Sequence, residues 1–246
     1  MVGAGLFLAL GFTQFRLNRQ HTSPGTAVLA IDVSQSMSRT DVLPSRLEAA
    51  KTAAQAFLDK LPPELRVGLV TFAGSAKLLV APSPDRSLVR LTLGSLQQGQ
   101  GTVIGDGVSA ALDAIRALRA QGSNGPAAVV LLSDGRDTGS LAPPEQAAAR
   151  AHTMGVKIYT VVIGQATAQS ETGANVELMR QIAETTGGST FTAATSDSLI
   201  RIYQDLGSRL STEVNVTDYG ALFIGIAGIF AIAATVALLV SLRSDF

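Results

Sequence analysis

The chain has 246 residues, enough for one globular domain with additional segments at its ends. Its 19 basic and 19 acidic residues give a formal net charge of zero, so no basic field attracts nucleic acid, and nucleic acid is not an expected partner. The absence of cysteine excludes disulfides, thiolate metal sites and cysteine nucleophiles.

The chain opens with an apolar, uncharged segment at residues 2–12, VGAGLFLALGF. This segment is shorter than the ~20 residues that cross the hydrocarbon core of a bilayer. A signal peptide would require a basic start, which the first three residues do not provide. We therefore interpret residues 1–22 as an incomplete apolar membrane anchor followed by a polar linker.

The next segment, residues 27–36, reads AVLAIDVSQS. Its apolar first half predicts a strand that is covered on both faces, as in the middle of a parallel sheet. Asp32, Ser34 and Ser36 follow at alternate positions, which turns one carboxylate and two hydroxyls to the same side. Hard oxygen atoms of this kind suit Mg²⁺, Mn²⁺ or Ca²⁺ rather than zinc. Taken alone, the pattern is more typical of residues that cap a turn or a helix than of metal ligands.

Beyond this segment, short apolar runs alternate with amphipathic stretches as far as about residue 210. The short runs predict six strands, at residues 27–31, 66–72, 77–80, 128–133, 156–163 and 189–191. The stretches between them predict six helices, at residues 44–61, 84–96, 104–121, 143–154, 176–186 and 196–210. This alternation predicts an α/β fold with a doubly wound, mostly parallel six-stranded sheet, in which 77–80 is an antiparallel edge strand. In the order 3-2-1-4-5-6, the reversal of strand order falls between the first and fourth strands.

Two further segments carry oxygen donors. Thr102 lies on a glycine-flanked loop just before a predicted helix, and Asp134 directly follows the fourth predicted strand. Because ligands bind beyond the carboxyl ends of the strands at the point of reversal, Asp32 and Asp134 are expected to lie at one place.

In order and residue type, these three segments resemble the metal-ion-dependent adhesion site of von Willebrand factor A (VWA) domains, which have a Rossmann-like fold. The resemblance covers roughly residues 26–210 and implies five metal ligands, Asp32, Ser34, Ser36, Thr102 and Asp134. In that family one coordination position stays open, and an Asp or Glu of a partner protein completes it, often with a shift of the last helix. The resemblance therefore implies a module that binds a protein partner through Mg²⁺, Mn²⁺ or Ca²⁺, and not an enzyme.

Two alternatives to metal-dependent binding stay open. The same metal could polarise a phosphoryl oxygen in a hydrolase, although the two histidines, His21 and His152, lie in a linker and a helix and make poor candidates for a base. The domain could also be a scaffold whose metal site is not used. Four carboxylates near the loops are expected to be solvated or to cap helices: Asp41, Asp106, Asp137 and Glu145.

The last part of the chain is strongly apolar. Residues 221–242, ALFIGIAGIFAIAATVALLVSL, contain no charged residue and are long enough to cross a hydrocarbon core of ~30 Å as a helix. We therefore expect three parts: the anchor segment and linker at 1–22, a VWA domain at 23–212, and a juxtamembrane linker with a transmembrane helix at 213–246.

The DVSQSMS sequence, the preceding apolar segment and the C-terminal span are together similar to the bacterial Bat (aerotolerance-type) membrane proteins and their actinobacterial relatives. Those proteins carry two spans before the domain and one after it, whereas this chain shows part of one before it. The family often accompanies MoxR-type AAA+ ATPases, so the resemblance implies such an ATPase or another membrane protein as the partner.

The side of the membrane is indicated only by a few basic residues. Arg16 and Arg19 favour a cytoplasmic domain, and Arg243 favours an extracytoplasmic one. The architecture of the family favours the extracytoplasmic side, so we expect a protein of the cell membrane with its domain outside.

Overall fold

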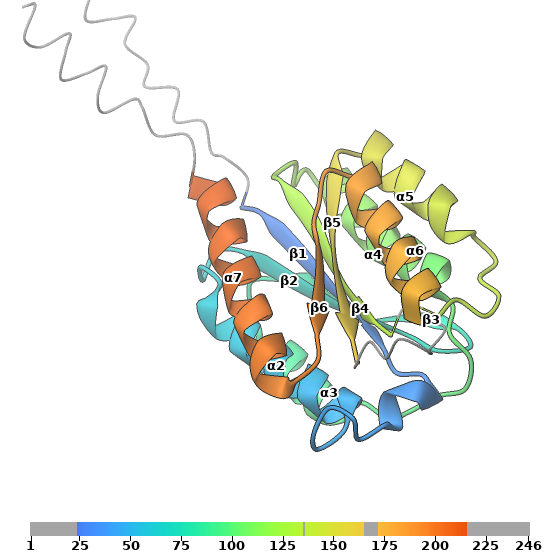
Figure 1. Ribbon diagram of the computed structural model, residues 1–246. Helices are drawn as coiled ribbons and strands as arrows, with labels where there is room; N and C mark the ends of the chain where they lie inside the picture. The colour runs from blue at the N-terminus through green and yellow to red at the C-terminus, as the bar shows by residue number, and fades with distance from the viewer. Residues whose placement is uncertain (1–23, 135, 165–171, 216–246) are drawn as a thin grey trace, which may run out of the picture.

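Strand β1 (Thr26–Asp32) is the centre of the computed structural model, which describes residues 24–134, 136–164 and 172–215 (Figure 1). All seven of its residues are buried. Leu29 and Ile31 belong to the hydrophobic core on one face of the sheet, and Val28 and Ala30 belong to the core on the other face. A continuous apolar run is required because both faces of this strand are covered.

Six strands form one sheet in the order β3-β2-β1-β4-β5-β6. Every neighbouring pair is parallel except β2 and β3, which are antiparallel. The predicted sheet, its strand order and its antiparallel edge strand are therefore confirmed. The other strands are β2 (Arg66–Phe72), β3 (Ala76–Ser83), β4 (Ala127–Ser133), β5 (Val156–Ile163) and β6 (Thr190–Ala193).

The helices form a layer on each face of the sheet (Figure 1). One layer consists of α2 (Arg46–Lys60), α3 (Ser87–Gly94) and α7 (Ser196–Asn215), and the other of α4 (Ile104–Ala120), α5 (Pro144–Thr153) and α6 (Thr172–Thr185). A short 3₁₀ helix, η1 (Gln35–Ser38), follows β1. All six predicted helices are present, three on each side, as a doubly wound sheet requires.

Local capping sets several helix boundaries. Helix α2 begins where the Ser45 side chain accepts a hydrogen bond from the Glu48 backbone N–H at 3.2 Å. Helix α3 is shorter than predicted because Asp85 accepts a hydrogen bond from the Ser87 N–H at 2.9 Å, which forms a turn ahead of the helix. Helix α6 begins earlier than predicted, at residue 172, and helix α7 ends later than predicted, at residue 215.

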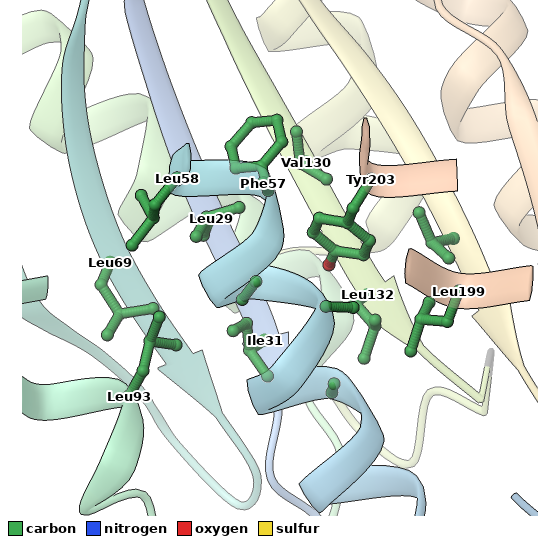
Figure 2. Close-up of a cluster of buried hydrophobic side chains, with 14 of the residues drawn as sticks. Leu29, Ile31, Phe57, Leu58, Leu69, Leu93, Val130, Leu132, Leu199 and Tyr203 are labelled. Carbon is green, nitrogen blue, oxygen red and sulfur yellow. The ribbon is translucent and has the colours of Figure 1, made fainter. Parts of the chain in front are cut away.

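The core under α2 and α7 is closed by an aromatic pair. The rings of Phe57 and Tyr203 meet edge to face, with centroids 5.6 Å apart and an interplanar angle of 86°. Figure 2 shows the two rings close to Leu29, Val130 and Leu132, which come from the two central strands. These contacts fix the layer of α2 and α7 on the strands that end in Asp32 and Ser133.

The segments expected at the membrane lie outside the described residues. This applies to residues 1–22 and to the predicted span at 221–242, which therefore stays a prediction. Within the described part of the chain, no helix combines the length and the apolar character needed to cross a membrane.

We predict that Gly107→Ala destabilises the domain, because helix α4 packs closely on β2 at this position. A Cβ atom on Gly107 would lie 2.6 Å from Cδ1 of the fully buried Phe72. Overpacking of this kind costs about 1–3 kcal/mol, which urea unfolding would measure.

The matched control is Gly94→Ala at the end of α3, where an added Cβ meets no atom within 4 Å. This variant should be unchanged or more stable by up to about 1 kcal/mol. Equal stability of the two variants would contradict the close packing of α4 on β2.

Candidate metal centre

Asp32 is the last residue of β1 and lies beside the end of β4. Its side chain is completely buried. One carboxylate oxygen, Oδ1, accepts a hydrogen bond from the Ser34 backbone N–H at 2.8 Å, and Oδ2 accepts one from Ser133 Oγ at 2.5 Å. The carboxylate is therefore held by the loop after β1 and by the last residue of β4, at the point where strand order reverses.

The pKa of Asp32 is raised from its ordinary value of 3.8 to about 6. Desolvation by burial is the largest cause, and the negative charge of Asp134 raises the pKa further. Hydrogen bonds from Ser133 and Ser34 act in the opposite direction but do not offset the burial. A bound cation would compensate both the lost hydration and the repulsion between the two carboxylates.

The two serines that follow β1 bring their hydroxyls together. The Oγ atoms of Ser34 and Ser36 are 2.9 Å apart. Their loop is joined to the next one, because the Gly99 N–H donates to the Val33 carbonyl at 2.7 Å and Ser34 and Gly99 form a parallel bridge. This contact connects the loop after β1 to the loop that carries Thr102.

Thr102 is buried, with 4% of its surface exposed. Its backbone N–H donates to Thr138 Oγ1 at 2.9 Å, and its carbonyl accepts from the Thr138 N–H at 2.8 Å. Thr138 belongs to the segment that follows Asp134, so these bonds hold the Thr102 loop against the loop after β4. Gly101 has a φ of +76°, a left-handed conformation that glycine adopts without strain.

Asp134 directly follows β4 and forms an ion pair with Arg46 at the start of α2. The distance from Arg46 Nη1 to Asp134 Oδ2 is 3.2 Å. The same guanidinium binds Asp41 in a fork, with Nε 2.8 Å from Oδ1 and Nη2 2.6 Å from Oδ2. The other oxygen of Asp134, Oδ1, lies 3.5 Å from the Arg136 N–H, which is at most a weak hydrogen bond.

The structure thus brings the loops with all five predicted ligands to one edge of the sheet, and it adds residues that the sequence analysis did not assign. Ser133 binds Asp32, and its only signal in the sequence is its position next to Asp134. Arg46 lies in the first turn of a helix, where positive charge is unfavourable. An arginine at such a position in the sequence could have indicated a residue with a specific partner.

The four carboxylates near the loops have different roles. Asp137 caps α4 by accepting from the Ile104 N–H at 2.8 Å, and Asp106 accepts from the N–H groups of Leu141 and Ala142. Glu145 lies in the first turn of α5, where its charge suits the helix dipole. The expectation of a solvated or capping side chain was wrong for Asp41, because the guanidinium of the buried Arg46 binds it.

The donor set is compatible with a hard divalent cation. It offers two carboxylates and three hydroxyls, the oxygen donors that Mg²⁺, Mn²⁺ and Ca²⁺ prefer. Across the described ranges no three or more His, Cys, Asp and Glu side chains gather to hold a metal ion, so a cation here would depend on the hydroxyls as well as the two carboxylates. The buried Asp32 receives only neutral donors from its hydrogen-bond partners Ser34 and Ser133, which leaves its negative charge for a cation to balance.

The sheet and its helical layers define a VWA domain. Residues 27–136 match the model of the von Willebrand factor type A domain. Two solved structures share the fold. BatB from Bacteroides thetaiotaomicron is 23% identical, with a TM-score of 0.61 over 76% of this chain and 98% of that chain. An aerotolerance-related membrane protein from Bacteroides fragilis is 20% identical, with a TM-score of 0.62 over 79% of this chain and 100% of that chain.

The chain belongs to the UPF0353 protein family. A UPF0353 protein of Mycolicibacterium gilvum is 37% identical over 234 residues, which cover 88% of this chain and 70% of that relative. The expected resemblance to VWA proteins of the Bat type is confirmed by the family model and by the two structures.

We predict that Asp32→Asn stabilises the metal-free protein at pH 7.5. Because the folded-state pKa of Asp32 is about 6 and its ordinary value is 3.8, folding takes up protons in this range. The ionised carboxylate destabilises the fold above pH ~6, and this cost disappears as the pH falls towards ~4. The asparagine variant should therefore gain up to about 3 kcal/mol at pH 7.5 and lose this part of the pH dependence.

Urea unfolding in EDTA at pH values from 4.5 to 8 tests this expectation. Asp59→Asn is the control, since Asp59 is 64% exposed and lies away from the site. An asparagine variant at position 32 with the stability and pH dependence of the wild type would refute it.

Proposed function

We propose that this protein is a membrane-anchored VWA module that binds a divalent cation, in the first place Mg²⁺, and through it a protein partner. The observation that carries the proposal is the buried Asp32 carboxylate. It accepts hydrogen bonds from the Ser34 N–H and the Ser133 hydroxyl, which are both neutral donors, and the hydroxyls of Ser34 and Ser36 meet beside it. The two histidines do not offer a base, since His152 lies in helix α5 and His21 in the predicted linker, and we therefore propose binding rather than catalysis.

In this proposal each donor has a distinct part. Asp32 and Asp134 supply the negative charge, and Ser34, Ser36 and Thr102 supply neutral hydroxyl oxygens. A cation held by two carboxylates and neutral oxygens keeps affinity for a further anionic oxygen. An Asp or Glu side chain of the partner would provide that oxygen.

The proposed partner belongs to a membrane-associated complex, which this protein helps to assemble. The predicted apolar segments at 2–12 and 221–242 support attachment to the cell membrane. We propose the extracytoplasmic side for the domain because the resemblance to Bat-type proteins implies it. One structural neighbour is described as an aerotolerance-related membrane protein, which agrees with this placement. With the domain outside, the proposed partner is another membrane protein. A MoxR-type AAA+ ATPase, which uses cytoplasmic ATP, would be the partner only of a domain that faces the cytoplasm.

We expect Mg²⁺ to bind the purified protein at pH 7.5 and to bind more weakly below pH ~6. Protons compete with the cation for Asp32, so the affinity should fall up to about tenfold for each pH unit below the pKa. Isothermal titration calorimetry measures both effects. Asp32→Ala should abolish binding, and Asp59→Ala, which removes an exposed carboxylate, should leave it unchanged. Failure of the folded wild-type protein to bind Mg²⁺ or Mn²⁺ would overturn the metal site.

The partner should be recovered only when the metal is present. We expect a membrane protein to co-purify with the full chain in Mg²⁺, and to be lost both in EDTA and from the Asp134→Asn variant. Quantitative mass spectrometry of the detergent-solubilised complexes measures this. Partners that stay bound in EDTA would instead identify the domain as a scaffold that does not use the site.

A further inference from the structure

Arg46 is a buried cation next to the proposed metal centre. It is the first residue of α2, and only 6% of its surface is exposed. Burying a guanidinium is costly unless its charge and its N–H groups are matched, and a positive charge at a helix N-terminus adds to the cost. A buried arginine at such a position therefore needs specific partners that offset this cost.

Three segments of the chain hold this guanidinium. Asp41 binds it in a fork through Nε and Nη2, and Asp134 receives Nη1. Gly164 at the end of β5 forms the third side, where a Cβ atom would lie only 2.5 Å from Nη2 and 2.9 Å from Cζ. The absence of a side chain at Gly164 gives the guanidinium its space, so its position is determined by packing as well as by charge.

The ion pair engages a single oxygen of Asp134. Arg46 takes Oδ2, whereas among the described residues Oδ1 has the weak contact at 3.5 Å with the Arg136 N–H. A carboxylate fixed through one oxygen presents the other in a defined direction. Outer partners of this kind orient the ligands of metal sites and commonly change metal affinity 10- to 100-fold when they are removed.

We infer that Arg46 is a positioning residue of the metal centre, which orients Asp134 towards the cation, and that Asp41 keeps Arg46 in place. The inference rests on the proposed function, since it assigns a role towards the cation proposed there. It adds two residues, Arg46 and Asp41, that lie outside the five proposed ligands.

Charge and orientation predict opposite effects at this site. Arg46 and Asp41 together carry no net charge, so the pair adds little long-range field at the metal. Removing Arg46 alone would make the net charge beside the site more negative by one unit, and this change would strengthen cation binding by Coulomb attraction. The loss of orientation would weaken binding. A variant that leaves the net charge unchanged separates these two effects.

The test is the double variant Arg46→Gln/Asp41→Asn, which removes one positive and one negative charge. We expect its dissociation constant for Mg²⁺ to rise 10- to 100-fold, measured by calorimetry on the full chain in detergent at 15 °C. The matched control is Arg90→Gln/Asp59→Asn, which removes a comparable arginine–aspartate pair, 2.7 Å apart, on the exposed surface between α2 and α3. The control should bind Mg²⁺ as the wild type does.

A second variant, Arg46→Lys, keeps the charge and loses the planar fork. It should also bind Mg²⁺ more weakly than the wild type, since a lysine cannot hold Asp41 and Asp134 in the same geometry. Thermal melting in EDTA, recorded for each variant, separates stability from affinity, because a purely structural role would lower the melting temperature and leave the Mg²⁺ affinity of the folded protein unchanged.

The Mg²⁺ titrations either support or overturn the role of Arg46. Weaker Mg²⁺ binding by both Arg46 variants, with normal binding by the control pair, supports it. Wild-type or tighter binding by the charge-neutral double variant overturns it while the metal site itself stands. If the wild-type protein binds no cation and Asp32→Ala changes nothing, the proposed function has failed, and the inference fails with it.

Discussion

The burial of one carboxylate, Asp32, is the constraint on which the rest of this structure depends. A charged group at the end of the most buried strand is unfavourable, and its pKa of about 6 shows how unfavourable it is. The surroundings lower the cost only in part, through the N–H of Ser34 and the hydroxyl of Ser133. A fold gains nothing in stability from this arrangement. It gains a carboxylate with a fixed orientation and an unmet need for positive charge, which is what a cation site requires.

The scaffold around Asp32 is rigid where the site needs it to be. Strands β1 and β4 are buried between two helical layers, and the pairing of Phe57 with Tyr203 ties α2 and α7 to the same strands. Three loops leave these elements and are joined to one another through the backbones of Val33, Gly99 and Thr102. The donors therefore lie on loops that are held at their ends by the strands and helices and along their length by hydrogen bonds to one another. Cation binding would therefore require little movement of these loops.

The two carboxylates of the centre lie in contrasting environments. Asp32 is enclosed by neutral donors, whereas Asp134 has a buried arginine as its partner. A cation would neutralise more unbalanced charge at Asp32 than at Asp134. Most of the binding energy would therefore come from Asp32 at the end of β1, and Asp134 after β4 would mainly orient the cation. Asp41 balances the charge of Arg46, so Arg46 can lie next to Asp134 without repelling a cation at the proposed site.

The sequence by itself predicted the strands and the mostly parallel sheet, and it named the oxygen donors that stay a prediction as metal ligands. A short apolar run with β-branched residues is typical of a strand covered on both faces, and an aspartate directly after such a strand lies at the carboxyl edge of the sheet. That is why Asp32 and Asp134 could be placed together from local patterns. Local patterns could not give the partners of these carboxylates. Ser133 meets Asp32 across 101 residues of sequence and Arg46 meets Asp134 across 88, and such contacts depend on strand register and on how α2 packs over the sheet. Only the tertiary structure decided these contacts, because a residue's neighbours across the sheet are fixed by the packing of the whole core and not by its own segment.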